Sequence, residues 1–306
     1  REQSIRQHAM HTARETVAAG QVPKPSAELQ QQHRRALKRY WNARSQLNTR
    51  LRAENLTLWR RLMPYDPIIT VAEDVVFFEC FSADESSYGC LTLDRDQCFS
   101  NAQNACVGTT NVDYSWDLYH NFQSLRSYRE TCFSINPEGF LVRTSEREDY
   151  REEKIELPDG WLRGFTQLQA AMMMPMKKVT LGVDAVYTLL AWLKRHREKQ
   201  GPRAIRFELK DGKAPRLMLE PWNVTIDSPS TTYQGPETEP VRIWGRRRLL
   251  SLARLLPLAS QIDVYLPGSG LPSFWVVQMG NMRLTLGLSG WTTNDWARGS
   301  SVQMRS

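Results

Sequence analysis

The feature that most constrains this chain is a pattern found twice in its second half: a short strand, an amphipathic helix and three further strands. One copy begins at Val179 and the other at Val241. Within each helix, apolar residues recur at three- and four-residue steps, which places them on one helical face. They are Val186, Leu189, Leu190 and Leu193 in the first copy, and Leu249, Leu252, Leu255 and Leu256 in the second.

The segments after each helix alternate in the way that half-buried strands do. Ile205 and Phe207 fall on one face, with Arg206 and Glu208 on the other. The predicted strands are RAIRFELK, PRLMLEP and NVTID in one copy, and QIDVYLP, FWVVQMG and MRLTLGLS in the other. The polar loop Ser228–Pro240 reads as a linker between the copies.

A third and fainter copy lies earlier in the chain. Thr109–Ser115 reads as a strand or an extended lead-in and Trp116–Tyr128 as a helix, followed by strands in TCFSIN, FLVRTS and EEKIELP. The interval is about sixty to seventy residues, which is typical of a duplicated supersecondary unit. The competing interpretation is an ordinary α+β domain that has one helix for every few strands.

The basic charge of the chain is concentrated at its N-terminus. Of a net charge of +7, Arg1–Leu62 contributes +9, from 13 Lys and Arg against 4 Asp and Glu, and the rest contributes −2. Ser26 can cap a helix over Ala27–Leu62. Its apolar stripe is sparse, so it could pack along another chain, bind nucleic-acid phosphates or remain solvated.

Large aromatic residues on this helix favour a packed partner. We therefore predict a partner-binding face formed by Trp41, Trp59, Arg34, Arg35 and Arg39. Pro64 and Pro67 then end the helix. Three leading strands are expected to follow, at Ile68–Val71, Val75–Phe81 and Tyr88–Leu93.

These observations predict an α+β chain with three strand-helix-strand-strand-strand repeats behind a long N-terminal helical arm. The predicted divisions are 1–62 for the arm, 63–160 for the first repeat with its leading strands, 161–229 for the second repeat, and 230–306 for the third repeat and a C-terminal tail. A further helix, Phe165–Met174, is expected after the turn LPDGWLRG.

Sequence signatures of catalysis are absent. The chain has no GxxxxGK[ST], GxGxxG, HExxH or GxSxG motif. Its five cysteines include no CxxC pair, and an odd count indicates free thiols in a reducing, cytoplasmic setting. Cys106 with His120 is the one conceivable nucleophile and base. We expect no enzyme, cofactor or metal site, with a thiol-dependent enzyme as the remote alternative.

Three consecutive arginines, Arg246–Arg248, stand at the start of the last predicted helix. A helix dipole disfavours cations at that end, so the cluster needs another explanation. Together with Arg254, these residues are the predicted contacts for phosphate or for an acidic partner.

Several segments resemble bacterial SWIM zinc-finger proteins, in the region before the finger. They include GWLRGFTQLQAAMMMP, GPRAIRFEL, RLMLEPW and LTLGLSGWTTNDW, and the resemblance spans roughly Asp66–Trp296. It implies a MoxR-type AAA+ ATPase and a von Willebrand A-domain protein as partners. The CxC and CxH ligand pattern of that family is absent here, so the finger is expected beyond Ser306 or is missing from this member.

The repeated unit also resembles the unit of DNA sliding clamps. The sequence thus leads to two hypotheses: a non-catalytic scaffold that docks through its N-terminal helices, and a nucleic-acid-binding protein that uses the basic arm and Arg246–Arg248. No run of about eighteen apolar residues is present, so no membrane partner is expected.

Overall fold

The computed structural model describes most of the chain. The described residues are 26–54, 67–82, 85–99, 106–112, 114–115, 118, 121–122, 125, 131–136, 138–144, 147–155, 159–197, 203–237 and 239–290. The chain divides into two compact units, Arg1–Leu62 and Met63–Ser306, and each is described by itself. None of the helices in the described ranges is both long and apolar enough to cross a membrane.

The first unit contains one helix, α2 (Ala27–Glu54). The backbone N–H of Leu29 donates to Oγ of Ser26 over 3.2 Å, so this serine caps the helix as predicted. Leu29 and Leu47 are more than half exposed, which fits the sparse apolar stripe. The predicted continuation to Leu62 lies outside the described residues.

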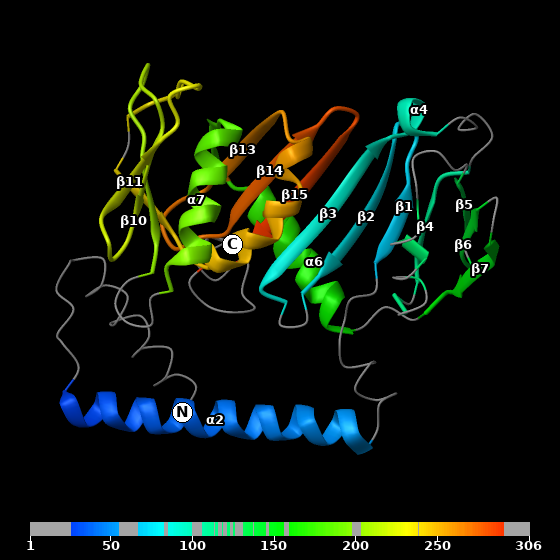
Figure 1. Ribbon diagram of the computed structural model, residues 1–306, viewed down its shortest axis with the longest axis horizontal. Helices are drawn as coiled ribbons and strands as arrows, with labels where there is room; N and C mark the ends of the chain where they lie inside the picture. Colours follow the sequence, from blue (N-terminus) through cyan, green and yellow to red (C-terminus); the bar gives the residue numbers. More distant parts are fainter. Residues whose placement is uncertain are drawn as a thin grey trace, which may run out of the picture. The chain divides into compact units, whose positions relative to one another are not determined.

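The second unit is built from antiparallel strands in three sheets (Figure 1). The eight-stranded sheet has the order β4-β1-β2-β3-β15-β14-β13-β8. Its strands are β1 (Ile68–Val71), β2 (Val75–Phe81), β3 (Ser87–Asp94), β4 (Gly108–Asn111), β8 (Lys177–Leu181), β13 (Gln261–Leu266), β14 (Ser273–Met279) and β15 (Met282–Leu288). A single turn of helix, α4 (Arg95–Cys98), follows β3. The pairing of β3 with β15 joins the leading strands to the last repeat.

Two smaller sheets complete the unit. The four-stranded sheet has the order β11-β10-β9-β12, and the three-stranded sheet has the order β5-β6-β7. Their strands are β9 (Ile205–Glu208), β10 (Arg216–Leu219), β11 (Val224–Asp227), β12 (Val241–Ile243), β5 (Thr131–Asn136), β6 (Gly139–Thr144) and β7 (Arg147–Glu153). The helices are α6 (Asp159–Met172), α7 (Val183–Arg195) and two 3₁₀ helices, η2 (Arg246–Arg254) and η3 (Leu256–Leu258).

The first strand of each repeat joins the sheet of another repeat. β8 begins the second repeat but pairs with β13 of the third, and β12 begins the third repeat but pairs with β9 of the second. β4 of the first repeat pairs in the same way with β1 of the leading strands. This reciprocal exchange locks the second and third repeats into one body.

Matching corners support the equivalence of the repeats. Val112, just after β4, forms an isolated bridge with Lys154, just after β7. At the corresponding corner of the second repeat, the N–H of Gly182, just after β8, donates to Oγ of Ser228, just after β11 (2.8 Å). In both places the end of a repeat's first strand meets the end of its last strand.

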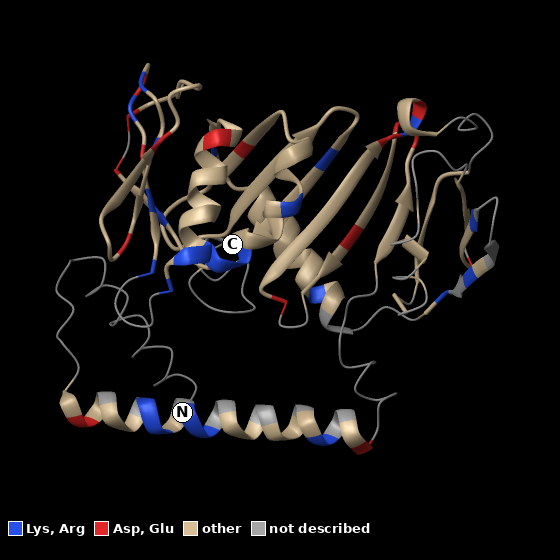
Figure 2. Cartoon of the chain, in the orientation of Figure 1, with Lys and Arg blue, Asp and Glu red and all other residues tan. Residues whose placement is uncertain are grey.

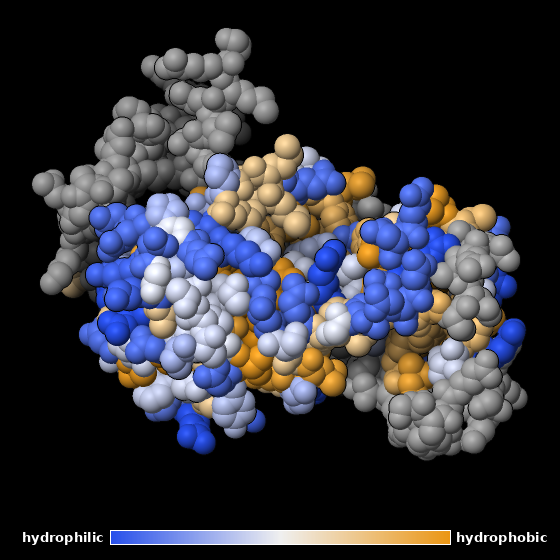
Figure 3. Space-filling model, turned by 90° about the horizontal axis from the view of Figure 1, so that it is seen from above, coloured by the Kyte–Doolittle hydropathy of each residue, from blue (hydrophilic) through white to orange (hydrophobic). Residues whose placement is uncertain are grey.

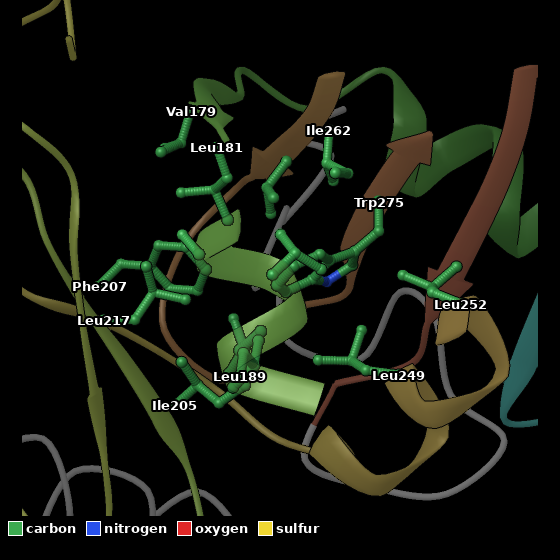
Figure 4. Packing of buried hydrophobic residues seen from close by; sticks show 14 of the residues in the cluster. Val179, Leu181, Leu189, Ile205, Phe207, Leu217, Leu249, Leu252, Ile262 and Trp275 are labelled. Atoms are coloured by element: carbon green, nitrogen blue, oxygen red, sulfur yellow. The ribbon is translucent and has the colours of Figure 1, made fainter. Parts of the chain in front are cut away.

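The largest core lies where α7 and η2 pack beside each other against the sheets (Figures 1 and 4). The predicted helical stripes supply it, because Val186, Leu189, Leu190, Leu193, Leu249 and Leu252 are all buried. Phe207 and Trp275 meet across it, with ring centroids 6.1 Å apart. The alternation that predicted the strands therefore identified their buried faces correctly.

The last helix differs in kind from the prediction, since η2 is a 3₁₀ helix rather than an α-helix. Arg246, Leu249 and Leu252 are buried and are spaced by three residues. A 3₁₀ helix has three residues per turn, so this spacing gives one continuous face. Gly245 precedes the helix at φ 76°, in the left-handed region that glycine tolerates.

Several predicted boundaries were wrong. β4 covers Gly108–Asn111, so the strand is shorter than the predicted segment Thr109–Ser115. β7 is Arg147–Glu153, earlier than the predicted EEKIELP, because this edge strand is charged and lacks an apolar alternation. α6 begins at Asp159, inside the predicted turn. Leu118, Asn121 and Phe122 are helical as predicted, and the remainder of Trp116–Tyr128 lies mostly outside the described residues.

Helix α6 covers the leading strands, although it follows β7 in the chain. Trp161 and Leu168 of α6 are buried with Phe81 and Tyr88 of β2 and β3. The approach is closest at Gly164, where an added Cβ would lie 3.1 Å from the Phe81 ring. Glycine thus allows the helix to sit directly on that aromatic ring.

The predicted linker Ser228–Pro240 connects β11 to β12, and one of its side chains is buried in the core. Tyr233 is 3% exposed and belongs to the main core. Its N–H donates to the carbonyl of Lys213 (2.9 Å), and its carbonyl accepts from the N–H of Gly212 (3.0 Å). One buried tyrosine therefore anchors a loop that composition alone marked as polar.

Candidate interaction surfaces

Arg246, predicted to contact phosphate, is an internal residue that is 4% exposed. Its guanidinium donates to the carbonyls of Ala204 (3.2 Å) and Glu220, and it lies 4.6 Å from the ring centroid of Trp222. A buried cation held by carbonyls and an aromatic face is satisfied within the fold. These contacts explain Arg246 without a ligand.

Arg248 holds two distant parts of the chain together. Its guanidinium donates to the carbonyl of Ser86, in the turn between β2 and β3, and to Oγ of Ser289 after β15 (3.2 Å). The N–H of Ser289 also donates to the carbonyl of Ser86 (3.0 Å). Arg248 therefore has a structural role at the end of the β3–β15 pairing.

Arg247 and Arg254 are exposed and keep their cationic groups near solvent. Arg247 donates to the carbonyl of Leu193 over 3.0 Å, which satisfies one of the last carbonyls of α7. Within the predicted cluster of four arginines, these two are accessible to phosphate or to an acidic partner. Binding by them stays a prediction.

The structure extends this exposed group in a way that the sequence did not suggest. Lys194, Arg195, Arg197 and Arg203 lie at the C-terminal end of α7 and before β9, close to Arg247, and all are exposed. Figure 2 shows Lys and Arg gathered where α7 ends and η2 begins. Within the described ranges, none of these five residues forms an ion pair with Asp or Glu. We call them the positive end of α7.

An aromatic group borders the positive end of α7. The rings of Trp192 and His196 stack with centroids 3.6 Å apart, and the Trp222 ring lies 6.1 Å from that of Trp192. The backbone N–H of His196 donates to the carbonyl of Trp192 (2.9 Å), which ends the helix. Because these rings are packed against one another, we assign them a structural role at the C-terminal end of α7.

The predicted docking residues on α2 are only partly described. Arg34, Arg35 and Arg39 are exposed along the helix. The side chain of Trp41 and all of Trp59 lie outside the described residues. The partner-binding face therefore stays a prediction, and three of its five residues are exposed on α2.

The cysteines present no catalytic arrangement in the described part of the chain. All five are free thiols. Burial raises the pKa of Cys90, and it also raises the pKa of Cys98, which disfavours the reactive thiolate of each. Cys106 is exposed, whereas its proposed base His120 lies outside the described residues. Among the described residues, no group of three or more His, Cys, Asp or Glu could hold a metal ion.

One carboxyl group has an altered acidity. The hydroxyl of Tyr88 donates to Oε2 of Glu79 over 2.7 Å, on the strand pair that α6 covers. Burial raises the pKa of Glu79, and the hydrogen bond from Tyr88 lowers it by a smaller amount. The thiol of Cys90 lies opposite Glu79 on the paired strand, but burial raises the pKa of Cys90 and disfavours its reactive thiolate, so we assign Glu79 to the folding of this region.

Exposed apolar side chains are found mainly on helices. The largest exposures are those of Met173 (86%), Tyr187 (65%) and Leu258 (63%). Figure 3 shows one face on which hydrophobic residues lie among a majority of hydrophilic ones. Surface apolar residues that are scattered singly are common in folded proteins.

Comparisons with solved structures show the fold. The structure described as the C-terminal region of FEN-1 bound to A. fulgidus PCNA matches with a TM-score of 0.55 and 11% identity, covering 76% of this chain and 91% of that chain. Proliferating Cellular Nuclear Antigen from Entamoeba histolytica matches with a TM-score of 0.49 and 12% identity over the same shares. No protein-family profile and no curated protein matches the chain. The repeated α+β units therefore have the fold of a sliding clamp.

Proposed function

We propose that this protein is a non-catalytic scaffold with a sliding-clamp fold, which acts by binding partner proteins. The observation that carries the proposal is the match with the PCNA of A. fulgidus, a clamp solved with the C-terminal region of another protein bound to it. The fold supplies a body of exchanged strands that could present surfaces to partners.

The docking element in this proposal is the N-terminal helix. α2 carries exposed arginines on a 28-residue helix, and a helix this polar gains little from covering a core of its own. Trp41 and Trp59 would anchor the partner. The resemblance to SWIM zinc-finger proteins supports a MoxR-type AAA+ ATPase and a von Willebrand A-domain protein as the partners to test first.

The test is co-purification of these two proteins with the full chain and with a chain that begins at Met63. The shortened chain should retain its circular dichroism spectrum and cooperative unfolding but lose the partners. A matched variant of the full chain, with Arg34, Arg35 and Arg39 changed to Gln, should bind less and fold normally. Retention of partners by the folded, shortened chain would contradict the proposal.

A second function, nucleic-acid binding, is favoured by the positive end of α7. Five exposed cations that have no carboxylate partner among the described residues would attract a phosphate backbone, and affinity should fall steeply as salt rises. Changing Lys194, Arg195 and Arg197 to Gln should weaken binding of a mixed-sequence duplex. Changing Lys210 and Arg216, which pair with Glu237 and Asp227, should have a smaller effect.

A further inference from the structure

Among the described residues, the exchange of first strands leaves one position of the fold without a strand. β4 pairs with β1, β8 with β13 and β12 with β9, so three of the four strand triplets have a fourth strand beside their first member. The fourth triplet is β5-β6-β7, where β5 is an outer strand. Within the described ranges, no strand pairs with the outer edge of β5.

A first strand in this fold is followed by a helix that covers a sheet, and α6 already fills that covering role for the leading strands. In the second repeat, β8 runs directly into α7, and the pair supplies both a sheet edge and a covering helix. For the leading strands β1 to β3, α6 supplies the cover from a later point in the chain. The covering role is therefore filled while the strand position beside β5 is not.

The outer edge of β5 has the hydrogen-bonding groups to accept a strand. Asn136 pairs with Gly139 across a two-residue turn, and the pair that closes such a turn is hydrogen-bonded. Because bonding alternates along an antiparallel pair, Ser134 and Cys132 also bond to β6. The N–H and C=O groups of Phe133 and Ile135 then point away from β6, toward the open edge.

The side chains along this edge define what would fit. Phe133 and Ile135 pack against the core, with the Phe133 ring 5.6 Å from that of Phe140, so an added strand would bury apolar residues on that face. The other face carries Cys132, and its neighbour across the pair, Arg143, is exposed. Arg151 is exposed on the same face, opposite Leu141.

We infer that the outer edge of β5 is a β-strand addition site for an extended segment of a partner protein, in which apolar residues alternate with acidic ones. The segment runs antiparallel to β5, as the added strand does in the three filled positions. Its backbone bonds to Phe133 and Ile135, its apolar residues cover the core, and its carboxylates lie on the same face as Arg143 of β6, the strand next to β5. Backbone bonds provide the affinity and the alternation provides the selectivity.

Cys132 allows a direct test, because it is an exposed thiol on this edge. The backbone of Cys132 is hydrogen-bonded to β6. Cys132 and the residue opposite it on the added strand would therefore form a non-hydrogen-bonded pair, in which the Cα atoms are about 4.5 Å apart and a disulfide can form. The probe is a six-residue peptide of alternating Val and Glu with one Cys, linked through a disulfide to Cys132 of the full chain. Linkage supplies a high effective concentration, so weak pairing is detectable. The same peptide linked to Cys106 is the control, each chain having the other exposed cysteine replaced by Ser.

Hydrogen exchange reports the result at single amides. In the free chain, the amides of Phe133 and Ile135 should exchange at least tenfold faster than those of Ser134 and Leu141. Linkage at Cys132 should slow them by at least tenfold, linkage at Cys106 should not, and a peptide with Lys in place of Glu should slow them less. Protection already present in the free chain, or no protection after linkage at Cys132, would overturn the inference. The scaffold proposal would stand in either case, since it rests on the clamp fold and on docking through the N-terminal helix.

Discussion

Arg248 donates a hydrogen bond to the carbonyl of Ser86, a residue 162 positions earlier in the chain. The contact closes the end of the β3–β15 pairing and also engages Ser289. It joins the leading strands to the last repeat at a point where the sequence suggested a ligand. The arginine is thus a connecting element of the second unit.

We expect Arg248→Ala to lower the free energy of unfolding by about 1.5–3 kcal/mol, because hydrogen bonds to a charged group contribute about that much. Urea unfolding at neutral pH measures the change. Arg254→Ala, an exposed residue on the same helix, should stay within about 0.5 kcal/mol of the wild type. Equal effects of the two changes would show that the Ser86 contact does not stabilise the fold.

Arg246 should be the most sensitive arginine of the cluster. Arg246→Met removes a charged donor from the carbonyls of Ala204 and Glu220, although Ala204 keeps the backbone N–H of Glu220, and we expect a loss of about 2–3 kcal/mol. Arg246→Lys should recover only part of it, because an ammonium group lacks the planar fork of a guanidinium. Thermal unfolding compares the two variants. A stable Arg246→Met protein that had lost only phosphate binding would instead support the ligand-binding role.

Gly164 is expected to tolerate no larger residue. The Cβ of Gly164→Ala would meet the buried Phe81 ring at 3.1 Å, and crowding of this kind costs about 1–3 kcal/mol. Combining it with Phe81→Leu should cost less than the sum of the two single changes, because the smaller side chain makes room. Three urea unfolding curves test this double-mutant cycle, and strict additivity would contradict the packing of α6 on β2.

The stability of the second unit should depend on pH through Glu79. Burial raises the pKa of Glu79 above its ordinary value of 4.5, so the folded chain binds this proton more tightly than the unfolded chain. The contribution is complete below about pH 4.5 and is lost as pH rises through the folded-state pKa. Glu79→Gln has no such proton to lose. Its stability relative to the wild type should therefore rise between pH 4 and pH 7, and a constant difference would count against a raised pKa.

Periodicity predicted the local structure of the repeats well. Leu189 and Leu193 of α7, and Ile205 and Phe207 of β9, are buried as their spacing indicated. The α+β class and the resemblance to a clamp unit are both confirmed. Short-range patterns succeed here because burial of one face imposes a period on each element.

Long-range pairing could not be predicted in the same way. Nothing in Val241–Ile243 shows that β12 pairs with β9 of the preceding repeat, since an alternating segment fits any open apolar edge. The burial of Arg246 could not be predicted for a related reason. A buried cation is recognisable only when its acceptors, here the carbonyls of Ala204 and Glu220, are known to surround it.

Tyr233 shows what composition does not report about a linker. Its segment is rich in Ser, Thr, Pro and Gly, which indicates a linker. A single aromatic side chain that reaches the core is enough to fix the loop, and no local pattern reports that event. The open edge of β5 could not be predicted either, because it is recognised only by comparison with the other three triplets, each of which pairs with a fourth strand.

The measurement that tests the scaffold account most directly is the mass of the assembly by light scattering. The full chain, of 35.4 kDa, would be mixed with the AAA+ and von Willebrand A-domain partners, with and without duplex DNA and at two salt concentrations. The account predicts a complex of fixed mass that does not change with DNA and is lost when the chain begins at Met63. A chain that binds neither protein, but increases in mass with DNA at low salt only, would contradict it and would favour nucleic-acid binding at the positive end of α7.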